Sequence, residues 1–201
     1  MVVAVLKKIM AVVMLFAAST TVALAHVDPG TVSGGFLSGF THPLFGWDHV
    51  AAMVAVGLWG AFLGRPAIWV LPVVFPMVMA FGGVLGIIGV PLPAVETGIA
   101  ASALVLGLMV VLAVRPPLWV AAVLVGVFAI FHGYAHGAEL PAAANPLLFS
   151  LGFVVATGLL HLSGIAFGEL SRWSWGAMAV RAGGAVIALA GVGFLTGLLV
   201  A

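Results

Sequence analysis

The chain has 201 residues, of which 65% are hydrophobic and only 5% are charged, and its mean hydropathy is +1.38. A soluble domain usually carries charges at about a quarter of its positions, so this composition excludes a soluble enzyme and a disordered chain. Six lysines and arginines are also too few to form a nucleic-acid-binding surface. The composition therefore predicts a polytopic membrane protein. Because cysteine is absent, any metal site must use imidazole, carboxylate, thioether or backbone oxygen.

Residues 1–25 predict a cleavable secretory signal peptide. Lys7 and Lys8 form a basic segment, residues 9–18 form an apolar segment, and Ala23-Leu24-Ala25 is a small-x-small cleavage site. Cleavage would leave His26 as the N-terminus on the periplasmic side of the membrane. The alternative is an uncleaved first span, for which the apolar segment is short.

Residues 26–201 are expected to form one all-α transport domain, a bundle of six transmembrane helices. Prolines, arginines and short polar segments separate apolar runs that each suffice for a span of about 20 residues. The predicted spans are 42–64, 67–90, 94–114, 117–138, 146–170 and 178–200. Pro72 and Pro76 are expected to kink the second span. The 27 glycines suit close packing of apolar helices in lipid.

The distribution of charge predicts how the bundle lies in the membrane. With a periplasmic N-terminus, the alternation of spans places all four arginines after residue 25 at the cytoplasmic ends, as expected from the positive-inside rule. These arginines are Arg65, Arg115, Arg172 and Arg181. Four of the five acidic residues and most histidines then lie at or near the periplasmic ends. We therefore predict an inner-membrane protein with a polar cavity that faces the periplasm.

The first candidate metal-binding motif is Thr-His-Pro-Leu-Phe-Gly-Trp-Asp-His, residues 41–49. If this segment is one helix with Pro43 in its first turn, His42 and His49 share a face and Asp48 lies about 100° away. Two imidazoles and a carboxylate suit a divalent transition metal. Asp48 could bind the ion directly or orient an imidazole. The alternative is a hydrogen-bonded cluster in which His42 caps the start of the helix.

The second candidate motif, residues 131–139, closes the fourth span. His132 and His136 are four residues apart and Glu139 follows three residues later, so the three side chains lie along one stripe of a helix. The spacing resembles that of a zinc-protease helix, but the glutamate that would act as general base between the histidines is absent. Gly133 and Gly137 would let a neighbouring helix approach closely. The alternative is a motif that serves helix packing alone.

Three further residues are weaker candidates for metal binding or relay. Glu96 begins the third span, where a carboxylate also stabilises a helix N-terminus. His161 lies deep in the fifth span. It could act as a second binding station or relay, or it could be a neutral histidine that is hydrogen-bonded to a carbonyl group. His26 could chelate a metal through its imidazole and free amine, or be a disordered terminal residue.

The two motifs together resemble those of the HupE/UreJ family of bacterial nickel permeases. The similar segments are His42-Pro43-Leu44-x-Gly46-x-Asp48-His49 and Phe131-His132-Gly133-x-Ala135-His136-Gly137-x-Glu139, supported by Val95-Glu96-x-Gly98 and Leu160-His161-x-x-Gly164. The resemblance implies nickel uptake for hydrogenase or urease maturation, with cobalt associated with some members. It also implies that the metal is handled by His42, Asp48, His49, His132, His136 and Glu139.

We therefore expect a permease, and not an enzyme, that moves Ni²⁺ or Co²⁺ from the periplasm to the cytoplasm. Its expected partners are the divalent ion and membrane lipid, without nucleic acid or a prosthetic cofactor, and the sequence does not identify a cytoplasmic metallochaperone. The alternatives are a metal-binding accessory protein or sensor, and an intramembrane metallohydrolase that uses the same cluster. Nitrogen and oxygen ligands suit nickel, cobalt, zinc and copper alike, so nickel is implied by the resemblance alone.

Overall fold

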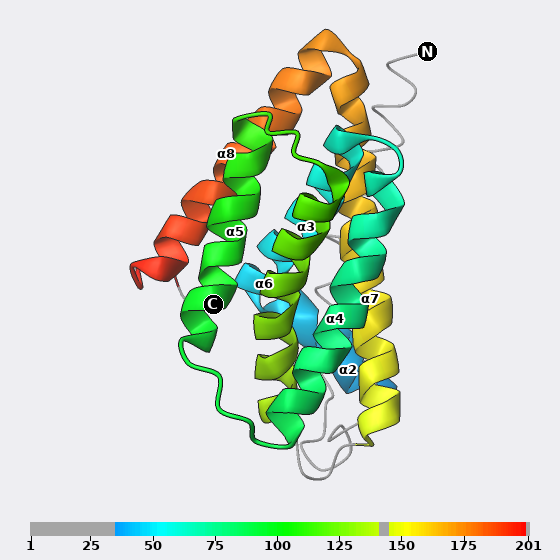
Figure 1. Ribbon diagram of the computed structural model, residues 1–201, viewed down its shortest axis with the longest axis vertical. Helices are drawn as coiled ribbons and strands as arrows, with labels where there is room; N and C mark the ends of the chain where they lie inside the picture. Colours follow the sequence, from blue (N-terminus) through cyan, green and yellow to red (C-terminus); the bar gives the residue numbers. More distant parts are fainter. Residues whose placement is uncertain (1–34, 141–144, 200–201) are drawn as a thin grey trace, which may run out of the picture. The chain divides into compact units, whose positions relative to one another are not determined.

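The computed structural model describes residues 35–140 and 145–199, and this part of the chain contains helices and no strand. The elements are α2 (Phe36–Phe45), α3 (Trp47–Leu63), α4 (Ala67–Ile87), α5 (Val95–Val111), α6 (Leu118–Ala138), α7 (Pro146–Gly168), the 3₁₀ helix η1 (Glu169–Arg172) and α8 (Ser174–Leu195). Figure 1 shows their arrangement. The predicted all-α fold class is confirmed for these residues, whereas the predicted signal peptide and His26 lie outside them.

Several helices are long and apolar enough to cross a membrane. Within the described ranges these are α4, α6, α8 and the continuous segment Pro146–Arg172. The pair α2 and α3 also qualifies when taken together, although the two helices are bent by 86° relative to each other. Helix α5 is apolar but shorter, at 17 residues. The helices therefore define a membrane protein with four or five candidate spans.

The prediction of one continuous helix over residues 42–64 is wrong. Gly46 adopts an extended conformation, with φ −85° and ψ 105°, and separates α2 from α3. Glycine has the weakest helix preference after proline, which explains why the interruption falls here. Pro43 consequently lies inside α2, near its C-terminal end, and not in a first helical turn. His42 and His49 are therefore on two different helices.

The boundaries of the last two helices follow local capping signals. Asn145 caps α7, because its side-chain oxygen accepts hydrogen bonds from the backbone N–H groups of Leu147 and Leu148, both at 3.1 Å. The final helix runs over Ser174–Leu195 and not over the predicted 178–200. It ends before Gly197, whose φ of +72° is incompatible with a continuing helix.

Packing within the bundle is pairwise: α4 lies against α6, α5 against α8, and α3 against α7, which also contacts α2. The interior is apolar, with Trp59, Phe75 and Leu106 fully buried. Large apolar side chains also point outward, among them Trp119 and Leu189, which are 70% and 71% exposed. An apolar exterior of this kind suits contact with lipid.

Glycines let α4 and α6 approach until their backbones touch. A Cβ atom added to Gly133 would collide with the carbonyl group of Met79, and one added to Gly137 would collide with that of Gly83. The predicted small-xxx-small contact on the second motif is thereby confirmed. The same contact holds the helix that carries His132 and His136 at a fixed depth against α4.

We predict that Gly133→Ala destabilises the protein. The added methyl group must separate α4 from α6, and overpacking of this kind typically costs about 1–3 kcal/mol. The matched control is Gly158→Ala on α7, where no atom lies within 4 Å of the added Cβ. Thermal unfolding in detergent should show a lower midpoint for Gly133→Ala and no decrease for Gly158→Ala. Equal midpoints would contradict the assigned contact.

Candidate metal centre

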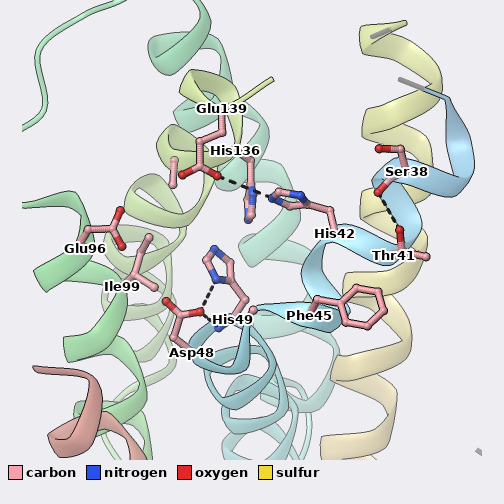
Figure 2. A pocket seen from close by; sticks show the side chains of 12 residues that line it. Ser38, Thr41, His42, Phe45, Asp48, His49, Glu96, Ile99, His136 and Glu139 are labelled. Carbon is pink, nitrogen blue, oxygen red and sulfur yellow. Dashed lines mark hydrogen bonds and ion pairs between the residues drawn. The ribbon is translucent and has the colours of Figure 1, made fainter. Parts of the chain in front are cut away.

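A pocket of about 520 Å³ opens where α2, α3, α5 and α6 meet. Figure 2 shows its polar side chains converging from these helices. The residues that line it are Ser38, Thr41, His42, Phe45, Gly46, Asp48, His49, Glu96, Ile99, Ala135, His136 and Glu139. Five of the six residues predicted to handle metal are in this wall, and the sixth, His132, is buried behind it.

Three donor groups, from His42, His136 and Glu139, lie close together in this pocket. One ligand atom from each lies within 4.8 Å of the other two, and His42 Nε2 is 3.9 Å from Glu139 Oε2. The His42 side chain is 39% exposed and that of Glu139 is 60% exposed, whereas His136 is only 8% exposed. The trio thus extends from the mouth of the pocket to its floor. Two imidazoles and a carboxylate form a donor set that suits a divalent transition metal.

Asp48 orients the ring of its neighbour His49. The Nδ1 atom of His49 is 2.7 Å from Asp48 Oδ1, and the same oxygen accepts the backbone N–H of His49, also at 2.7 Å. A carboxylate can only accept hydrogen bonds, so this partner assigns the ring proton to Nδ1. The Nε2 lone pair is then left free, and Nε2 is buried without a hydrogen-bond partner. Carboxylate–histidine pairs of this kind commonly orient metal-binding imidazoles, which favours the orienting role over the coordinating one.

Four histidine rings are packed in a row of direct contacts. His136 contacts both His42, at a centroid distance of 4.9 Å, and His49, at 4.5 Å. His49 in turn contacts His132 edge-on at 4.7 Å. The stripe predicted on α6 is therefore turned toward both histidines of the first motif. Contacts among side chains of α2, α3 and α6 bring the two sequence motifs together.

Ser102 on α5, which the sequence did not single out, contacts one of the predicted site residues, His132. Its hydroxyl group is 2.9 Å from His132 Nε2, and both residues are fully buried. The only local signal is one hydroxyl group within an apolar span, and such a serine often bonds merely to its own helix backbone.

The weaker candidates are placed differently from one another. Glu96 lines the pocket in the first turn of α5, across from His42 (Figure 2). His161 is buried on α7 and does not line the pocket. The ring of Phe75 contacts both His161, at 5.3 Å, and His132, at 5.5 Å. The structure thus brings Glu96 into the site but leaves His161 behind an aromatic ring.

Basic side chains gather at the opposite end of α3. A second pocket, of about 500 Å³, is lined there by Arg65, Arg115 and Arg172. Arg172 pairs with Glu169 at 2.5 Å, and the Arg115 guanidinium lies 4.5 Å from the centre of the Phe62 ring. With 17 residues in α3 and a rise of about 1.5 Å per residue, the two pockets are about 25 Å apart. The histidine-rich pocket and the arginine-rich pocket thus lie at opposite ends of α3.

The fold and the pocket define an apolar helix bundle of the membrane-protein class, with a histidine–carboxylate cluster that could hold a metal ion. The family model described as "HupE / UreJ protein" matches residues 12–194. Protein HupE of Rhizobium leguminosarum bv. viciae is 46% identical over 174 residues, which cover 87% of this chain and 91% of that protein. The chain belongs to the HupE/UreJ family. No solved structure matches it significantly.

We predict that Asp48→Asn weakens metal binding while the fold is retained. An amide can donate as well as accept, so the His49 ring is no longer restricted to one tautomer. Loss of such an orienting partner typically costs about 10–100-fold in metal affinity, which calorimetric titration of the purified protein with Ni²⁺ would measure. Glu169→Gln, at the arginine end of the bundle, is the control and should bind as the unmodified protein does. An unchanged affinity in Asp48→Asn would argue against the orienting role.

Proposed function

We propose that this protein is a permease that carries Ni²⁺, or alternatively Co²⁺, from the periplasm to the cytoplasm. The observation that carries this proposal is the cluster of His42, His136 and Glu139 in an open pocket of an apolar bundle. Ionisable groups at membrane depth are usually functional. Membership of the HupE/UreJ family favours nickel and a role in supplying hydrogenase or urease assembly.

Six spans follow if the bent pair α2–α3 and the shorter α5 each count as one crossing. A broken helix is tolerated at membrane depth where its free backbone groups line a polar cavity, and Gly46 lies in the pocket wall. A cleaved signal peptide over residues 1–25 would then place the N-terminus in the periplasm. The arginine pocket would face the cytoplasm, in agreement with the positive-inside rule.

The proposed route begins at the exposed carboxylate of Glu139 and the half-exposed His42. Each ligand that binds the cation replaces a water molecule, so partial dehydration precedes entry into the bundle. His136 is suited to receive the ion next, because its ring contacts both His42 and His49. We propose two later stations for the ion. The first is His132, and the second is His161, which lies beyond the Phe75 ring.

Transport is preferred here over catalysis. A metallohydrolase needs a general base beside the metal-bound water, for which Glu96 is a carboxylate available in the pocket wall. Membership of the HupE/UreJ family nevertheless favours transport. An accessory protein or sensor would use the same ligands without moving the ion. Only a permease moves metal across a sealed bilayer, and this property separates transport from both alternatives.

We predict that liposomes containing the purified protein accumulate Ni²⁺ in their lumen. The substitution His42→Ala should reduce this uptake to the level of protein-free vesicles. Removal of this imidazole deletes one of the three clustered donors. A lumenal metal-sensitive dye would report entry, with Co²⁺ and Zn²⁺ as competitors to establish selectivity. Glu169→Gln is the matched control and should retain uptake. Binding of Ni²⁺ without uptake by the unmodified protein would favour the accessory or sensor function.

A further inference from the structure

The hydroxyl group of Ser102 lies between a backbone carbonyl and an imidazole. Ser102 Oγ is 2.5 Å from the carbonyl oxygen of Ile99 and 2.9 Å from His132 Nε2. All of this lies in the interior, since Ser102, Ile99 and His132 are each fully buried. The serine comes from α5 and the histidine from α6, thirty residues further along the chain.

Counting hydrogen atoms assigns the direction of both bonds. A carbonyl oxygen only accepts, and a serine hydroxyl group has a single hydrogen to donate. That hydrogen must lie toward Ile99, because two oxygens at 2.5 Å need a hydrogen between them. The hydroxyl oxygen is therefore left as an acceptor toward His132, whose Nε2 must donate.

A neutral imidazole with its proton on Nε2 has a lone pair on Nδ1. In His132 this Nδ1 atom is buried and has no hydrogen-bond partner among the described residues. We propose that Ser102 is a positioning residue of the metal site, which holds His132 in the Nε2–H tautomer and keeps Nδ1 free to bind the cation. This inference rests on the proposed function, in which His132 is a station for the ion.

The neighbouring histidine is held in a corresponding way. Asp48 accepts the proton on His49 Nδ1, which leaves His49 Nε2 as the free atom. The rings of His49 and His132 are in edge-on contact, 4.7 Å apart. Each ring thus has one nitrogen occupied by an orienting partner and one nitrogen unpartnered and buried. His136 differs, because neither of its ring nitrogens has a hydrogen-bond partner in the described structure.

The tautomer can be tested in the metal-free protein. With ¹⁵N-labelled histidine, the His132 resonances, identified through His132→Ala, should show a protonated Nε2 and an unprotonated Nδ1. Ser102→Ala should lose this preference, whereas Ser102→Thr, which retains a hydroxyl group, should preserve it. A protonated Nδ1 in the unmodified protein would overturn the proposal. This measurement does not depend on whether the protein binds or transports nickel.

Metal affinity then tests whether Ser102 acts through His132. Ser102→Ala should weaken Ni²⁺ binding by about 10–100-fold, as typical for an orienting partner, and should have no further effect in the His132→Ala background. Ser163→Ala is the matched control, because Ser163 makes the same type of bond, to the carbonyl of Leu160 at 2.7 Å. An equal loss in both backgrounds would show that Ser102 only supports packing, and would overturn the proposal. Absence of Ni²⁺ binding by the unmodified protein would instead contradict the proposed function.

Discussion

Direct backbone contact between helices is the constraint on which the rest of this structure depends. In lipid, no hydrophobic force drives apolar helices together, so close van der Waals packing must do so. Gly133 and Gly137 allow this between α6 and α4, and Gly39 and Gly152 allow it between α2 and α7. These contacts fix α6 against α4 and α2 against α7, and the imidazoles carried by α2 and α6 meet in one pocket.

The buried imidazoles are stabilised only in part. An unpaired buried polar group is costly, and Asp48 and Ser102 each satisfy one ring nitrogen of a neighbouring histidine. The other nitrogen of each ring, and both nitrogens of His136, have no hydrogen-bond partner in the described structure. Under the proposed function, a bound cation would supply the missing partner of these imidazoles.

The interruption at Gly46 determines how the first motif contributes to the pocket. On one straight helix, His42 and His49 would be two turns apart along a single face. The 86° bend instead places them on two helices that border the same cavity. His136 can then contact both rings at once. The exposed end of the site and its buried end are joined through this one side chain.

The sequence by itself determined the all-α membrane class, the separation of the arginines from most histidines and acids, and the candidate residues of both motifs, five of which line the pocket. These features depend on composition and on the local periodicity of a helix, which relates residues three or four positions apart. Only the tertiary structure decided that the first helix breaks at Gly46, that Ser102 meets His132, and that His161 lies beyond Phe75. The physical reason is that Ser102 and His132 belong to different helices thirty residues apart. Their contact depends on how closely those helices pack, which no local spacing encodes.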